Sequence, residues 1–145
     1  MNTASQVVTE FFEQYELSRN TLDLGLIASQ YPDSFMWADP NGARVVERQV
    51  VLASLPRGQE FLKALGHKFT KVLSINETGL DDHYVLVRVQ FLWRFEKAPA
   101  QPIDVKLDST FILYINNGSP KIVFQHECED FQQALRARGV LPATQ

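Results

Sequence analysis

The sequence predicts an α+β domain in which helices cover one face of a curved antiparallel sheet. Two changes along the chain indicate this class: apolar residues recur at helical spacing in the first third, and the period becomes two after Gly66. Turn signals separate the later strands at hairpin distances. The chain has 145 residues, so we expect a single domain over residues 1–145 with an ordered core over residues 5–138.

Three helices are expected in the first half. The first spans residues 5–18, where five apolar residues fall on one face: Val7, Val8, Phe11, Phe12 and Tyr15. A second, shorter helix follows Asn20 or Thr21, either of which can cap it, and Pro32 ends it. A third helix has Pro56 in its first turn and ends at Gly66. Residues 49–54 fit a strand or a helix.

Six strands are expected around these helices. Residues 34–39 alternate, the Asp-Pro-Asn-Gly turn at 39–42 follows, and residues 43–48 return. Later strands are predicted over residues 69–78, 85–95, 103–115 and 121–127, and a short helix over 130–138 closes the domain. The strand over 85–95 has the clearest alternation, because every second residue is valine or aromatic. Hairpin connections predict antiparallel pairing of these strands.

Composition excludes several classes of function. The net charge is −3 and the basic residues are scattered, which does not suit a nucleic-acid partner. The longest apolar run is far below the ~20 residues that span a bilayer, and no signal peptide is evident, so we expect a cytoplasmic protein without a membrane partner. Cys128 is the single cysteine, and His67, His83 and His126 show no ligand spacing. We therefore expect no metal and no cofactor.

Four features give the chain a resemblance to a known family. They are FFEQY at 11–15, YPDSFMWADPNG at 31–42, VRVQFLW at 87–93 and the Asn-Gly hairpin signal at 117–118. Their order and spacing resemble the nuclear transport factor 2-like superfamily, which includes ketosteroid isomerases and SnoaL-like polyketide cyclases. The resemblance implies a cone-shaped, strongly curved, mixed or antiparallel sheet with N-terminal helices on its concave face, the cystatin-like α+β roll. It also implies an apolar pocket inside the cone.

The same resemblance implies a set of pocket residues. Trp37, Val89, Phe91 and Trp93 would face inward as ligand-binding residues. Asp39 matches the general base of ketosteroid isomerases and Tyr15 matches their oxyanion-hole tyrosine. Each has an ordinary structural alternative: Asp39 can accept hydrogen bonds from its own turn, and Tyr15 can be a core residue.

The third isomerase group is a protonated aspartate, and its place falls on Thr110 when counted back from the Asn-Gly turn. A hydroxyl donates a weaker hydrogen bond, and Asp108 could substitute only if the strand register shifted. His126 is a further ligand-binding candidate that could face inward or outward, since one bulge would reverse its side. The acids at 127, 129 and 130 are expected in the first turn of the final helix.

The outer face of the sheet is expected to pair with a second copy. Leu86 and Leu92 lie on that face of the strand over 85–95, and the strand over 103–115 is apolar on both faces. A strand buried on both sides needs a cover on each, so we expect a homodimer. The alternative is a solvated outer face with scattered leucines.

The sequence thus predicts a pocket-forming domain that binds a small apolar or partly polar molecule. As an enzyme it would be a cofactor-free isomerase, cyclase or dehydratase, with Asp39, Tyr15 and Thr110 acting beside a carbonyl. The alternative is a non-catalytic dimerisation or ligand-sensing module whose cavity is filled by its aromatic side chains. A cavity above ~300 Å³ that reaches both Asp39 and Tyr15 would favour the first interpretation.

Overall fold

The computed structural model describes residues 4–142, so the ends of the chain at 1–3 and 143–145 lie outside the described residues. Ten elements follow one another: α1 (Gln6–Thr21), α2 (Leu24–Ala28), β1 (Ser34–Asp39), β2 (Gly42–Glu47), α3 (Arg48–Ala64), β3 (His67–Gly79), β4 (Tyr84–Phe95), β5 (Ile103–Asn116), β6 (Ser119–Glu127) and α4 (Phe131–Ala137). This order confirms the predicted α+β class.

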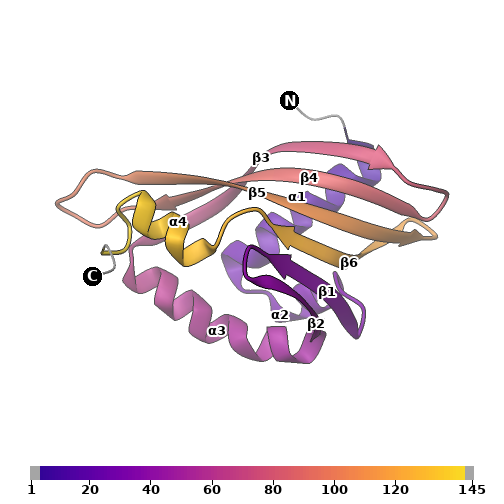
Figure 1. The fold of residues 1–145 in the computed structure, drawn as a ribbon, viewed down its shortest axis with the longest axis horizontal. Helices are drawn as coiled ribbons and strands as arrows, with labels where there is room; N and C mark the ends of the chain where they lie inside the picture. Colours follow the sequence, from indigo (N-terminus) through magenta and orange to yellow (C-terminus); the bar gives the residue numbers. More distant parts are fainter. Residues whose placement is uncertain (1–3, 143–145) are drawn as a thin grey trace.

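The six strands form one curled sheet in the order β2-β1-β6-β5-β4-β3. Figure 1 shows β3, β4 and β5 as long neighbouring strands, with α1 behind them and α3 along the lower side of the molecule. The strands from β3 to β6 form an antiparallel meander, as predicted. The expectation of antiparallel pairing throughout is wrong at one place, because β1 runs parallel to β6. Helix α3 carries the chain from β2 to the opposite edge, so β1 is left beside the last strand.

Side-chain caps define the ends of the shorter helices. The Asp23 carboxylate caps α2 by accepting from the Leu26 amide at 3.1 Å, so Asp23 is the cap itself and Asn20 and Thr21 are not. The Asp130 carboxylate caps α4 by accepting from the Gln133 amide at 3.0 Å. Such caps satisfy amides that a helix leaves unpaired.

The helix α3 begins at Arg48, so the ambiguous residues 49–54 are helical and Pro56 lies inside the helix. None of its residues is fully buried. A helix of 17 residues in a domain core would normally bury an apolar stripe. Here the inward side of α3 faces open space, and this space is the candidate site.

The core is divided into two clusters. The larger joins α1 to the sheet through Val8, Phe11, Phe12, Tyr15, Val87, Val89, Phe91, Phe111 and Leu113, among others. The smaller joins α4 to the far ends of β4 and β5 through Phe95, Val105, Leu107, Ala134 and Leu135. Trp93 packs against both clusters. Within residues 4–142, no helix has the length and apolar character needed to cross a membrane.

The connection between α3 and β3 depends on Gly66, and this gives a first prediction. Gly66 has a φ of +93°, and a Cβ there would lie 2.6 Å from the Glu96 carbonyl oxygen. We expect Gly66→Ala to lower the free energy of unfolding by at least about 2 kcal/mol. Gly58→Ala is the matched control, because a Cβ at this position inside α3 meets nothing within 4 Å. We expect it to raise stability by about 0.5–1 kcal/mol. Urea denaturation of both variants measures the free energy of unfolding. Equal changes in the two variants would contradict the requirement for glycine at position 66.

Candidate functional site

A hollow of about 530 Å³ lies between the two core clusters. Its wall is built by α1, by the inward side of α3, by α4 and by the concave face of the sheet. Five of the eight predicted site residues line it: Tyr15, Trp37, Asp39, Phe91 and Trp93. Large aromatic side chains therefore form the wall of the hollow, and they do not fill it.

Tyr15 occupies the wall between α1 and the sheet. Its ring packs against Phe91 and Phe111, with centroids 5.6 and 5.7 Å apart. Trp93 lies further along β4 and packs against Phe131 of α4 at 4.9 Å. These ring contacts hold the two aromatic side chains in place within the wall of the hollow.

Three predicted residues are placed elsewhere. Val89 is buried in the larger core cluster and does not line the hollow. Thr110 lies opposite both Arg88 and His126 in the sheet, on its outer face. Thr110, predicted as the third group of the site, therefore does not reach the hollow, and His126, whose side the sequence left open, faces outward. Side chains alternate along a strand, so the neighbouring residues Ser109 and Glu127 face the hollow instead.

Asp39 reaches the hollow but is also held by its own turn. Its Oδ1 accepts from the Asn41 amide at 2.8 Å, and its Oδ2 accepts from the Trp37 indole at 3.3 Å. The Asn41 side chain in turn donates to Asp130 at 2.8 Å, which joins the β1–β2 turn to the cap of α4. Both expectations for Asp39 thus hold structurally: it bonds its turn and it borders the hollow.

A further carboxyl group in the wall of the hollow is Glu127, the last residue of β6. Its two oxygens accept hydrogen bonds from the Ser109 hydroxyl at 2.5 Å and from the Gln125 amide at 2.8 Å. Burial raises the pKa of Glu127, the negative charge of Asp39 adds to that rise, and the two hydrogen bonds act in the opposite direction. A carboxyl group of this kind can hold or release a proton nearer neutral pH than an exposed one.

Glu127 begins a chain of hydrogen bonds that crosses the wall. The side-chain carbonyl oxygen of Gln125 accepts a hydrogen bond from the Tyr31 hydroxyl at 2.8 Å. The Tyr31 oxygen in turn accepts one from Nη2 of Arg19 at 2.8 Å. Burial raises the pKa of Tyr31 far above its usual value, so this phenol stays protonated and can donate. The neutral residues Gln125 and Tyr31 therefore join the carboxyl group of Glu127 to the guanidinium of Arg19.

His67 is a further wall residue that the sequence did not single out. Its Nε2 lies 2.9 Å from the Thr70 hydroxyl, and its ring packs against Trp93 at 5.5 Å. Burial lowers the pKa of His67, which favours the neutral ring. No group of three or more His, Cys, Asp or Glu residues within residues 4–142 is arranged to hold a metal ion.

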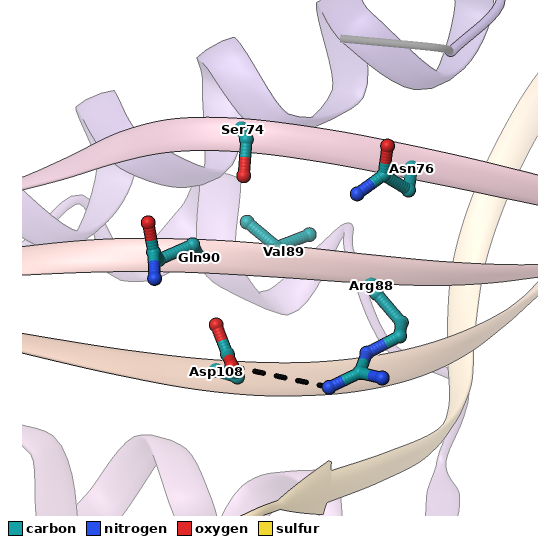
Figure 2. A pocket seen from close by; sticks show the side chains of 6 residues that line it. All are labelled: Ser74, Asn76, Arg88, Val89, Gln90 and Asp108. Atoms are coloured by element: carbon teal, nitrogen blue, oxygen red, sulfur yellow. Dashed lines mark ion pairs between the residues drawn. The ribbon is translucent and has the colours of Figure 1, made fainter. Parts of the chain in front are cut away.

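The outer face of the sheet carries a shallower depression of about 280 Å³. Figure 2 shows its polar side chains on three neighbouring strands: Ser74 and Asn76, Arg88 and Gln90, and Asp108. Arg88 and Asp108 form an ion pair at 3.9 Å, and both side chains remain about half exposed. An exposed pair of this kind contributes little to stability. The enclosed hollow, which holds partly buried titratable groups, is the better candidate site.

A curled sheet whose helices enclose a hollow is an α+β roll. Comparison with solved structures identifies which fold of this class the chain adopts. An NTF2-like protein of unknown function from Shewanella oneidensis shares 15% identity, with 85% of this chain and 97% of that chain covered and a TM-score of 0.65. Aln2 from a Streptomyces species shares 15% identity, with coverage of 90% and 93% and a TM-score of 0.69. A protein of unknown function with a cystatin-like fold from Nostoc punctiforme shares 9% identity, with coverage of 90% and 96% and a TM-score of 0.65.

These likenesses establish that the chain has the nuclear transport factor 2-like, or cystatin-like, fold. The likeness to these solved structures confirms the predicted fold. No family model matches the sequence, and no curated protein matches it. A shared fold of this kind does not define an activity, so function has to be argued from the residues of the hollow.

The raised pKa of Glu127 predicts a specific dependence of stability on pH. Between 4.5, the ordinary pKa of this group, and its raised value, the folded chain keeps a proton that the unfolded chain has released. The contribution of Glu127 to stability is therefore greatest at low pH and is lost as the pH rises. We expect the stability of Glu127→Gln relative to the parent to increase as the pH rises above 4.5.

Denaturation of both proteins at each pH measures that difference, and other titrating groups cancel because they are shared. A difference that is constant with pH would show that the pKa of Glu127 is not raised by folding.

Proposed function

We propose that this domain binds a small, largely apolar molecule in the hollow and transfers a proton at a carbon beside a carbonyl group. The observation that carries the proposal is the partly buried carboxyl group of Glu127, whose pKa is raised in a hollow that also exposes the Tyr15 phenol. The volume of about 530 Å³ exceeds the ~300 Å³ typical of the smallest ligand pockets. The alternative, a module with a filled cavity, is therefore disfavoured.

In this mechanism the Glu127 carboxylate removes a proton from the carbon next to the carbonyl. The electron pair of the broken C–H bond moves toward the carbonyl oxygen, and the Tyr15 hydroxyl donates a hydrogen bond to the resulting enolate. Glu127 then returns the proton to another carbon of the same molecule, which completes an isomerisation without a cofactor. Asp39 is the second carboxyl group that can serve as the base.

A β,γ-unsaturated cyclohexenone is a suitable neutral probe, because its isomerisation to the conjugated ketone changes the ultraviolet absorbance. We expect Glu127→Gln to lower the rate about 10²–10⁴-fold, the usual contribution of a positioned base. Glu60→Gln is the control, since Glu60 is exposed on α3 and does not line the hollow. We expect its rate to equal that of the parent.

Asp39→Asn separates the two carboxyl groups. We expect less than about a tenfold loss, because burial raises the pKa of Glu127, which suits it as the base, while Asp39 is held by the backbone amide of its own turn. A larger loss for Asp39→Asn than for Glu127→Gln would make Asp39 the base. No isomerisation above the buffer rate by the parent protein would overturn the enzymatic proposal.

We further propose that two copies associate through the outer face of the sheet. Leu86 lies opposite Ile112 on that face, and Phe124 lies beside Ile112 on the next strand. These apolar side chains share the outer face with the polar depression and would be covered by the same face of a second copy.

The association can be measured as molar mass in solution. We expect twice the chain mass of 16.5 kDa for the parent at micromolar concentration and a single chain mass for Leu86→Arg. Val45→Arg is the control, because Val45 is 66% exposed on the edge strand β2 and should leave the mass unchanged. A parent protein with the mass of one chain would contradict the proposal.

A further inference from the structure

Arg19 is a charged side chain in the wall of the hollow that forms no ion pair with another described residue. It lies one helical turn after Tyr15 on α1, and its guanidinium packs over the Tyr15 ring, 4.2 Å from the centroid. Its Nη2 donates to the Tyr31 hydroxyl at 2.8 Å. The side chain is thus fixed against two phenols in the wall of the hollow.

The other terminal nitrogen of Arg19 has no partner. Its Nη1 is shielded from solvent and makes no hydrogen bond. Among residues 4–142, the ion pairs formed by arginine involve Arg48, Arg88, Arg94 and Arg138, and none involves Arg19. A buried donor without an acceptor and a charge without a counterion both cost stability. This arrangement therefore calls for an acceptor that the chain itself does not supply.

Arg19 cannot remove this cost by losing its proton, because a guanidinium stays charged at any physiological pH. Glu127 differs, since a carboxyl group in the same wall can become neutral by keeping its proton. Of the two buried ionisable groups, Arg19 is the one that needs a counterion.

The lining of the hollow also carries charges of both signs. Lys63 near the end of α3 and Lys68 near the start of β3 accompany Arg19. The carboxyl groups of the lining are Asp39 from β1, Glu127 from β6, Asp108 from β5 and Glu129 from the segment before α4. A molecule with an anionic end would be oriented by these charges, with that end at Arg19 and its reacting carbon toward Glu127.

We infer that the hollow takes an organic acid, whose carboxylate binds the guanidinium of Arg19. A carboxylate fits because it is planar and singly charged, and because it accepts hydrogen bonds from a guanidinium in the plane of its fork. The wall between the charged ends is aromatic, so the body of the acid is apolar. This inference deepens the proposed function by naming its substrate class: the reacting carbon lies toward Glu127 and the acid group lies at Arg19.

The test compares two probes of nearly equal shape, naphthoate and naphthamide, by isothermal titration calorimetry. We expect the parent protein to bind naphthoate at least about tenfold more tightly than the amide. Arg19→Met keeps a long apolar side chain over Tyr15 and removes the charge, and we expect it to abolish this preference while binding of the amide is retained. Arg19→Lys should keep part of the preference, since it restores the charge without the fork.

Arg57→Met is the matched control, because Arg57 is exposed on α3 and does not line the hollow. We expect it to keep the parent preference, which separates a local ion pair from a general effect of net charge. The retained binding of the amide by Arg19→Met shows that the hollow remains folded.

Several outcomes would overturn the inference: equal affinity of the parent for both probes, a preference for the amide, no binding of naphthoate at millimolar concentration, or an unchanged preference in Arg19→Met. The proposed proton transfer is tested separately with the neutral cyclohexenone and Glu127→Gln. A failure of the acid-binding inference and a failure of the catalytic proposal are therefore distinguishable.

Discussion

A β-bulge on β6 decides which side chains face the hollow. Ile112 of β5 pairs with Phe124, but the next residue, Leu113, pairs with Ile122, so Val123 is left without a partner in the ladder. Ile122 is buried in the core, and without the bulge strict alternation would carry the inward side on to Phe124 and His126. With the bulge, the inward positions become Gln125 and Glu127. One extra residue thus turns Gln125 and Glu127 toward the hollow in place of Phe124 and His126.

The parts of the site that the sequence predicts are those on strands with an unambiguous period. Trp37 and Asp39 share a face of β1 because they lie two residues apart in a strand. Phe91 and Trp93 share a face of β4 whose opposite face carries Arg88, Gln90 and Arg94. On β5 the same reasoning fails, since Phe111 and Ile112 are both apolar. Phe111 lies in the core and Ile112 on the outer face, so near Ser109 and Thr110 alternation cannot tell which of the two faces the hollow.

Two further residues could not be found from local patterns. Glu127 precedes Cys128, Glu129 and Asp130, and such a run of acids suits the start of a helix, yet only Asp130 caps α4. A bulge signal at Val123 would have been needed to place Glu127 inside. Arg19 resembles an ordinary cation in the last turn of a helix. Its role depends on Tyr31, twelve residues later, and on Gln125 at the other end of the chain.

The hollow exists because each helix covers a different part of the sheet. Helix α1 packs directly on β4 and β5, and α4 covers their far ends, so each helix forms its own apolar cluster. Helix α3 buries no residue completely and therefore spans the space between the clusters without filling it. The bulky side chains of Phe91 and Trp93 pack against these clusters, Phe91 on Tyr15 of α1 and Trp93 on Phe131 of α4. The aromatic content that favoured a filled cavity is used instead to build walls.

The separation of the two buried charges explains why both remain usable. A direct ion pair between Arg19 and Glu127 would satisfy each group and would also hold Glu127 ionised, with a lowered pKa. The structure instead inserts two neutral side chains, Tyr31 and Gln125, which pass hydrogen bonds from one group to the other without cancelling either charge. Glu127 can then take up a proton, and Arg19 is left with a donor that no acceptor of the chain satisfies. The spacing by Tyr31 and Gln125 therefore allows a single hollow to hold both the proposed acid–base group and the proposed anion site.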